Sequence, residues 1–325
     1  DGPGSPETLT GDLDAASHVY ADGDQSHTIT VYATTSRGDI DAGTLQINVT
    51  NVAPTLTISG DDTVIVNASY TLDLTSADPG DDTITQWSIN WGDGSDTQIV
   101  TGSPDSITHV YTLAGDYTIS ATATDEDGTF TANSTTLNVA PIVTMTGNGM
   151  AVEAQNYILT VDAIGLAGNT WTIDFNDGTP VVTVTGDGQL QVPHVYADGP
   201  AQRIVTATVV SDQGAFAPVD LLVNVMNADP LLAITGADTT PVNQDYTLNL
   251  AVNDPGDDTV DSWTIDWGDG NTQLVDGALE SVTHQYALAG DYTITASAVD
   301  DDGTYAASPL DVTATPVVAI TAPAS

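Results

Sequence analysis

The stretch that decides the fold is Trp87-Ser88-Ile89-Asn90-Trp91-Gly92-Asp93-Gly94, followed further on by His109-Val110-Tyr111. In its first five residues, large apolar side chains alternate with polar ones, which is the period of a half-buried β-strand. The Gly-Asp-Gly that follows favours a turn, because glycine accepts a positive φ and aspartate bonds the turn backbone. The stretch therefore predicts a strand with one core-facing side that ends in a tight turn.

Related stretches recur along the chain. The strand-and-turn marker returns as Phe175-Asn176-Asp177-Gly178 and Trp267-Gly268-Asp269-Gly270, and His-x-Tyr returns at His18, His194 and His284. A boundary tetrapeptide that ends in proline lies about 90 residues from its next copy, a spacing that indicates repeated modules. Its prolines are Pro54, Pro141, Pro230 and, more weakly, Pro316.

Within each repeat the pattern is β throughout. Runs such as Tyr70-Thr71-Leu72-Asp73-Leu74 alternate, and no stretch keeps a helical period with caps. Short strands with turns at regular spacing predict an all-β fold of sandwiches with about seven strands each.

The ordered motifs Trp91-Gly-Asp-Gly, His109-Val-Tyr, Leu113-Ala-Gly-Asp-Tyr and Asp125-Glu-Asp-Gly resemble those of the PKD (polycystic kidney disease) domain family. The resemblance covers nearly the whole chain and implies tandem Ig-like, seven-stranded β-sandwiches arranged end to end. One departure is the slot often held by the family's inner tryptophan, and it leaves the expected fold unchanged. That slot holds Ile89, Ile173 and Ile265.

The markers divide the chain into five parts, of which the first and last are incomplete modules. They are a C-terminal part of a module (1–54), three full modules (55–141, 142–230 and 231–316) and the first strand of a following module (317–325). Modules 55–141 and 231–316 share Asp-Pro-Gly-Asp-Asp-Thr, whereas 1–54 and 142–230 share His-Val-Tyr-Ala-Asp-Gly. The modules therefore alternate between two types. We expect the chain to be a window on a longer repeat, with a pair of modules spanning about 80 Å at 3.3 Å per strand residue.

The charge is strongly one-sided. The 325 residues include 45 Asp and Glu but only Arg37 and Arg203 as basic residues, which gives a formal net charge of −43. Nucleic acid and anionic membranes need Lys and Arg, so both are excluded as direct partners, and no apolar run is long enough for membrane insertion. Cations, basic proteins and other copies of the chain remain. With no cysteine, each module must fold on its core or with a metal.

Neither repeated motif predicts catalysis. Each His-x-Tyr lies beside a strand with no second His or Cys to complete a zinc site, so packing and hydrogen bonding explain it better. Asp93, Asp177 and Asp269 recur as turn residues. No nucleophile elbow, phosphate loop or His-Glu-x-x-His motif is present, and the sequence predicts a protein that is not an enzyme.

Acidic turns form the candidate metal sites. In a sandwich of this connectivity, the loop between the second and third strands and the turn between the last two lie at the end where the chain enters. Clustered carboxylates with backbone carbonyls suit Ca²⁺, and some PKD-family members carry calcium in this region. The alternative is a solvated acidic turn of a halophile-like surface. The candidate ligands are Asp78, Asp81, Asp82, Asp125 and Asp127, and in the later module Asp254, Asp257, Asp258, Asp300 and Asp302.

Module 142–230 carries Ile164-Gly165-Leu166-Ala167-Gly168 and Ser211-Asp212-Gln213-Gly214 at the same places, so its site should be absent or weak. The favoured function is a calcium-stiffened structural rod in an extracellular filament, surface layer, stalk or adhesin at the cell surface. Its partners would be other copies or neighbouring modules. The alternative is a polysaccharide- or protein-binding accessory region of a larger secreted protein, which would need an outward-facing aromatic platform.

Overall fold

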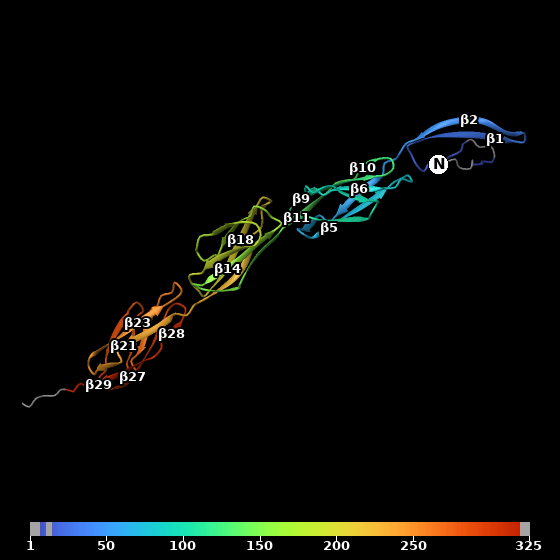
Figure 1. Ribbon diagram of the computed structural model, residues 1–325. Coiled ribbons are helices and arrows are strands. Elements are labelled where there is room, and N and C mark those ends of the chain that lie inside the picture. The colour runs from blue at the N-terminus through green and yellow to red at the C-terminus, as the bar shows by residue number, and fades with distance from the viewer. Residues whose placement is uncertain (1–6, 11–14, 319–325) are drawn as a thin grey trace, which may run out of the picture. The chain divides into compact units, whose positions relative to one another are not determined.

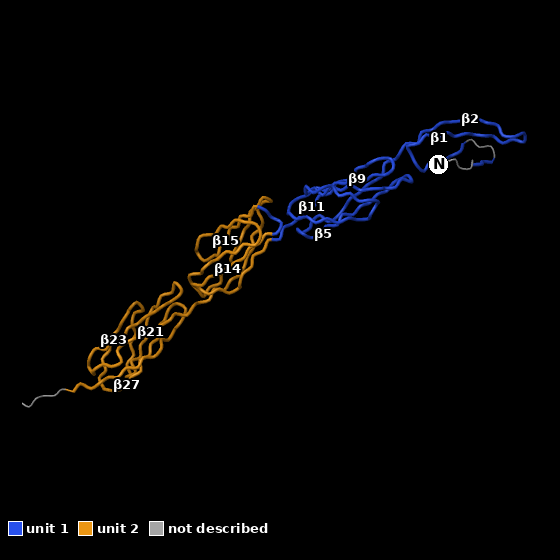
Figure 2. The backbone as a smooth tube through the Cα atoms, viewed as in Figure 1, with its two compact units in different colours: residues 1–142, 164–167 blue, residues 143–163, 168–325 orange. Residues whose placement is uncertain are grey.

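The computed structural model describes residues 7–10 and 15–318 (Figure 1). The chain divides into two compact units, residues 1–142 with 164–167 and residues 143–163 with 168–325 (Figure 2). Every regular element in the described part is a β-strand. No described segment forms a helix long and apolar enough to cross a membrane.

The first unit begins with an antiparallel hairpin of two long strands. β1 (Gln25–Thr35) pairs with β2 (Gly38–Val49), with a register shift between Val31 and Tyr32. A complete module follows and is called the β3–β11 module below. Its strands are β3 (Thr55–Gly60), β4 (Thr63–Ile65), β5 (Ser69–Ala77), β6 (Gln86–Asn90), β7 (Gln98–Thr101), β8 (Ser106–Val110), β9 (Gly115–Thr124), β10 (Thr129–Thr131) and β11 (Thr135–Ala140).

Two sheets make up this module. One has the order β3-β5-β8, and the other has the order β4-β11-β9-β6-β7 with β10 added beside β9. β4 runs parallel to β11, with Val64 opposite Val139, whereas the other pairings with a printed register are antiparallel. The short strand β4 and the last strand of the module, β11, therefore lie side by side.

The second unit holds two more modules of the same design. The β12–β20 module comprises β12 (Ile142–Gly147), β13 (Met150–Val152), β14 (Asn156–Ile164), β15 (Thr170–Asp174), β16 (Val182–Thr185), β17 (Leu190–Val195), β18 (Ala201–Ser211), β19 (Gly214–Ala215) and β20 (Val219–Met226). The β21–β29 module comprises β21 (Leu231–Gly236), β22 (Thr239–Pro241), β23 (Asp245–Asn253), β24 (Ser262–Asp266), β25 (Thr272–Asp276), β26 (Ser281–Gln285), β27 (Gly290–Val299), β28 (Thr304–Ala306) and β29 (Leu310–Thr315).

The strand order of the first module is repeated in both, with sheets β12-β14-β17 and β21-β23-β26 facing the larger sheets. The all-β, Ig-like sandwich predicted from the sequence is confirmed. Each described module has nine strands instead of about seven, because the opening strand is split in two and a short strand such as β10 follows the last turn. The boundaries at residues 54, 141, 230 and 316 stay predictions.

The opening strand splits because it changes sheets at a glycine. Gly60 ends β3, and a Cβ placed there would collide with the hydroxyl of Tyr70. Gly147 stands in the same way against Tyr157, and Gly236 against Tyr246. Glycine is needed at this bend because the buried tyrosine ring occupies the space of a side chain.

The core is formed by the alternating strand that the sequence singles out. Trp87, Ile89 and Trp91 are at most 1% exposed, as the period-two pattern predicts. Their counterparts in the other modules are at most 2% exposed, so the isoleucines in the inner-tryptophan slot are core residues in all three complete modules. These counterparts are Trp171, Ile173, Phe175, Trp263, Ile265 and Trp267.

The two incomplete modules differ from the complete ones. The β1–β2 hairpin leaves Val31 and Leu45 more than half exposed, whereas the corresponding faces of the complete modules are buried. Asp1 and Gly2, which the sequence aligns with the end of a Trp-Gly-Asp-Gly marker, lie outside the described residues. Of the strand predicted in 317–325, Val317 and Val318 are exposed and not in a strand, and residues 319–325 lie outside the described part.

Candidate metal centre

A buried aspartate organises the last turn of the β3–β11 module. Asp125 follows β9 and is only 6% exposed. Its Oδ1 accepts hydrogen bonds of 2.9 Å from the backbone N–H groups of Asp127 and Gly128, which close the turn into β10. Its Oδ2 is buried without a hydrogen-bond partner. A buried carboxylate oxygen in that state is costly unless a cation or proton satisfies it.

The β21–β29 module repeats this turn. Asp300 is also 6% exposed, and its Oδ1 accepts from the N–H groups of Asp302 and Gly303 at 2.9 and 2.8 Å. Its Oδ2 again lacks a partner. The same orphaned oxygen therefore occurs in two modules.

The loop between β5 and β6 lies beside this turn, since the Thr83 N–H donates to Glu126 at 2.9 Å. In it, Oδ1 of Asp78 accepts a hydrogen bond from the Gly80 N–H at 2.8 Å, and its Oδ2 is buried without a partner. Asp254 stands in the same position before Gly256, with a longer contact of 3.4 Å. Its Oδ2 is likewise unpartnered. The Asp-Pro-Gly turn thus places one more carboxylate beside the last turn in each of these two modules.

The preceding segment of chain is tied to each loop by a backbone hydrogen bond. The Asp81 N–H donates to the Ala21 carbonyl, and the Asp257 N–H donates to the Ala197 carbonyl, both at 2.9 Å. Ala21 and Ala197 belong to the two His-Val-Tyr-Ala-Asp-Gly stretches. The next residue of each stretch, Asp22 or Asp198, therefore lies close to the acidic loop.

Two groups of carboxylates result. The first acidic cluster contains Asp22, Asp82 and Asp127, and the second contains Glu153, Asp198, Asp258 and Asp302. In each cluster, one oxygen from every member lies within 4.8 Å of the others. Oxygen ligands at such spacing suit a hard divalent cation, and the buried oxygens of Asp258 and Asp302 that lack partners fit the same chemistry. The residues present therefore fit calcium.

Glu153 is the most deeply placed member. It is fully buried, and its Oε2 accepts from the Gly199 N–H at 2.6 Å while its Oε1 accepts from the Ala228 N–H at 2.8 Å. Gly256 closes over it, because a Cβ at that position would stand 2.8 Å from the Glu153 carboxylate. Both carboxylate oxygens of Glu153 are therefore held by backbone N–H groups.

The clusters raise the pKa values of their own members. Desolvation and the charges of Glu153 and Asp302 raise the pKa of Asp258 to about 7. Desolvation and the charge of Asp127, with smaller contributions from Asp22, raise the pKa of Asp82 to about 6. The pKa values of Asp127, Asp254 and Asp302 are raised for the same reasons. Carboxylates that repel one another in this way are relieved by a cation.

The ten predicted ligands fall into three groups. Asp82 with Asp127, and Asp258 with Asp302, are members of the two clusters. Asp78, Asp125, Asp254 and Asp300 lie beside them with orphaned oxygens. Asp81 and Asp257 contribute backbone N–H groups to the link with the preceding segment. Whether any of the ten binds a metal stays a prediction.

Asp22, Glu153 and Asp198 are not among the ligands predicted from the sequence. A signal for two of them was present, since Asp22 and Asp198 occupy the same position in the shared His-Val-Tyr-Ala-Asp-Gly stretch. Glu153 had none, because it lies in a turn whose counterparts in the two neighbouring modules are Val66 and Val242. Its importance arises from burial.

The β12–β20 module has a different last turn. Ser211 replaces the buried aspartate, and its hydroxyl accepts from the Gln213 N–H at 3.1 Å. The loop before β15 is shorter and contains Gly165 and Gly168 with positive φ. Among the described residues, no metal-type cluster includes this turn.

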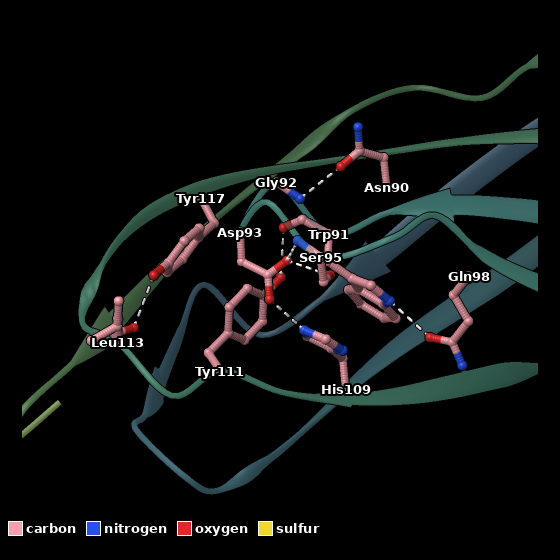
Figure 3. A network of polar contacts seen from close by, with 10 residues as sticks. All are labelled: Asn90, Trp91, Gly92, Asp93, Ser95, Gln98, His109, Tyr111, Leu113 and Tyr117. Carbon is pink, nitrogen blue, oxygen red and sulfur yellow. Dashed lines mark hydrogen bonds and ion pairs between the residues drawn. The ribbon is translucent and has the colours of Figure 1, made fainter.

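A second polar network recurs in all three complete modules and joins the two motifs of the sequence. In Figure 3, His109 lies flat against Trp91, with ring centroids 4.6 Å apart, and its Nε2 is 2.7 Å from Oδ2 of Asp93. The Tyr111 hydroxyl donates to the Trp91 carbonyl at 2.9 Å. Although burial raises it, hydrogen bonds from Ser95 and His109 lower the pKa of Asp93 overall.

The same contacts appear as His194 with Asp177 and as His284 with Asp269, at 2.6 and 2.8 Å. Each histidine stacks on Phe175 or Trp267. The histidine-aspartate pair is therefore part of the packing of every complete module, in keeping with the structural role expected from the sequence.

Comparison with known proteins gives a family match. The PKD domain family matches residues 51–139 and 227–314, which together form more than half of the chain. No curated protein matches.

Similar solved structures include a tetra-tandem repeat in the extending region of a large adhesion protein. It is 20% identical over 90% of this chain and 82% of that chain, with a TM-score of 0.40. Another is the PKD domain of an M14-like peptidase from Thermoplasmatales archaeon SCGC AB-540-F20. It is 26% identical over 26% of this chain and 96% of that chain, with a TM-score of 0.24.

Proposed function

The chain belongs to the PKD domain family, and on that premise we propose that it is a non-catalytic structural component of an extracellular filament, surface layer, stalk or adhesin. The observation that carries the proposal is the repetition of one module design with the same buried core. Modules of this kind serve as spacers, since repeats that contact only their neighbours build extended arrays. Its partners are neighbouring modules and other copies of the chain.

Calcium is the proposed cofactor. The acidic clusters supply oxygen ligands, and the orphaned oxygens of Asp125 and Asp300 need a positive partner. Neither basic residue of the chain is in a described ion pair with these clusters, because the described ion pairs are those of the three histidines. A divalent cation is the simplest group to neutralise them.

The alternative accessory role receives less support. Polysaccharide-binding surfaces usually display aromatic rings, but all five tryptophans of the chain are at most 1% exposed. A pull-down of the full chain on insoluble polysaccharides tests this role, and we expect no retention beyond that of an acidic control protein.

Small-angle scattering of the full chain in calcium tests the structural role. A compact protein of this length has a radius of gyration of about 20 Å. Three sandwiches in line, each about 40 Å long from strands of 8–10 residues, give about 35 Å. A value near 20 Å in calcium contradicts an extended spacer.

A further inference from the structure

The second acidic cluster takes its ligands from two consecutive modules. Glu153 and Asp198 belong to the β12–β20 module, whereas Asp258 and Asp302 belong to the β21–β29 module. All four lie in the second compact unit. A cation bound by one member from each module would therefore link the two modules directly.

The first cluster is likewise formed by residues from two consecutive parts of the chain. Asp22 comes from the segment before the β1–β2 hairpin, and Asp82 and Asp127 come from the β3–β11 module. Asp22, Asp82 and Asp127 correspond in position to Asp198, Asp258 and Asp302. The arrangement is therefore built twice, from three matching residues and a matching backbone hydrogen bond.

A separate observation points to a ligand. Asp300 is more than nine-tenths buried, its Oδ2 has no partner, and its charge acts on both Asp254 and Asp302. The hydrogen bonds that the Asp300 side chain makes are both on Oδ1. The free oxygen is thus left beside the second cluster without a proton donor in the described part of the chain.

Glu153 connects the cluster to the linker between the modules. Its Oε1 accepts from Ala228, which lies in the Asn227–Pro230 connector, and its Oε2 accepts from Gly199, next to Asp198. A cation on the Glu153 carboxylate would hold the connector and the Asp198 segment through one side chain. Ordinary calcium binding inside one module would not need this residue.

We propose that a divalent cation, calcium by its oxygen ligands, bridges Glu153 and Asp198 of one module to Asp258 and Asp302 of the next and fixes their relative orientation. The first cluster forms the equivalent bridge before the β3–β11 module. The ligand residues alternate in the sequence, because Val66, Leu113 and Gln213 stand at the positions of Glu153, Asp198 and Asp302. The inference rests on the calcium binding proposed above.

The test uses the full chain, which has no cysteine of its own. Cysteines replace the exposed Val181 and Leu274, one in each module, and carry spin labels. Calcium affinity is measured by calorimetry, and the distribution of label distances by pulsed electron paramagnetic resonance. With millimolar calcium we expect one narrow distribution, and with chelator a distribution at least twice as wide.

The variants Asp198→Asn and Asp302→Asn should weaken calcium binding at this cluster at least tenfold and restore the wide distribution at millimolar calcium. Both residues are at least partly exposed, so these variants should fold. Glu153→Gln should do the same, with Glu280→Gln as the matched control, because Glu280 is exposed and outside the cluster.

The outcomes separate the two proposals. If calcium binds but the distance distribution stays wide, the bridge is wrong and calcium binding within modules stands. If the distribution is narrow with and without calcium, the bridge is again wrong. If the chain binds no calcium at millimolar concentration, both the bridge and the calcium part of the proposed function are wrong.

Discussion

The β12–β20 and β21–β29 modules share one network and differ in another. In both, a histidine stacks on an aromatic ring and contacts the aspartate of the preceding turn. Their last turns differ, since Ser211 stands where the other module has the buried Asp300. The features that every module keeps belong to the fold, and the features that alternate indicate a task performed only at certain positions along the chain.

The largest effect is expected from a substitution in the buried core that all complete modules share. Trp263→Ala removes a fully buried ring and should destabilise its module by about 3–5 kcal/mol. Because a domain is stable by only about 5–15 kcal/mol, this module should unfold well before the others in urea. Trp171→Ala should cost the β12–β20 module a similar amount, and Leu274→Ala, at a 72% exposed position, serves as the control. Equal costs for Trp263→Ala and Leu274→Ala would contradict the assigned core.

Calcium removal should affect the feature in which the modules differ, which is the acidic last turn. A site held at a hundred times its dissociation constant stabilises the folded state by about 2.7 kcal/mol, and extracellular calcium modules have constants of roughly 10⁻⁴ to 10⁻³ M. Chelation should therefore lower the melting temperatures of the β3–β11 and β21–β29 modules. Scanning calorimetry can follow the transitions, assigned with the tryptophan variants. If no transition shifts on chelation, the metal assignment fails.

The histidine-aspartate pair should matter about equally in every complete module. His109→Ala leaves the partly buried Asp93 without its ring partner and should cost about 1–3 kcal/mol. His194→Ala should cost the β12–β20 module a similar amount. Calcium affinity should be unchanged in both variants, and urea unfolding with calcium titration measures the two quantities. A variant that unfolds normally but loses calcium binding would overturn the packing role.

The aspartate of the same pair predicts that each complete module loses stability in acid. The pKa values of Asp93, Asp177 and Asp269 are lowered in the folded state. Their contribution is therefore fully present above the unfolded pKa of about 3.9 and is lost as the pH falls through the lowered folded values. Asp93→Asn should make the stability of the β3–β11 module less sensitive to pH below about 4. An unchanged pH dependence in this variant would argue against the contribution.

The smallest effect concerns the acidic clusters without metal. The folded pKa of Asp258 is raised to about 7, so its contribution to stability is fully present below the unfolded value of about 3.9 and is lost as the pH rises through 7. In chelator, the β21–β29 module should therefore melt at a higher temperature at pH 5 than at pH 8. Asp258→Asn should reduce this difference, and a difference of the same size in the variant would contradict the shift. With calcium the trend should weaken, because protons and cation compete for the same oxygens.

The sequence could predict the fold because the fold depends on local pattern. The alternation of Trp87, Ile89 and Trp91 shows which face is buried, and the repeated Gly-Asp-Gly shows where the strand ends. The split of the opening strand was not predicted, because it depends on Gly60 meeting a tyrosine ring from another strand. A contact between residues of two different strands produces no periodic pattern in the sequence.

The candidate site was predicted in part for a related reason. The acidic turns are contiguous in sequence, so Asp82 and Asp127 could be brought together from the expected connectivity alone. Asp22 and Glu153 reach the clusters only through contacts made by a preceding part of the chain. Glu153 is distinguished by two hydrogen bonds from backbone N–H groups, and no residue type or spacing in the sequence predicts them.

The parallel pairing of β4 with β11 has a mechanical consequence. When the two ends of the β3–β11 module are pulled apart, β3 can peel from β5 one pair at a time, but β4 and β11 must slide along each other. The three pairs Thr63–Asn138, Val64–Val139 and Ile65–Ala140 then carry the load together in shear. The flanking hydrogen bonds from Asn138 to Asp62 and from Val66 to Ala140, both 2.9 Å, share that load. The same pairing recurs as β13 with β20 and β22 with β29, so tension between the two ends of any complete module loads this parallel pair in shear.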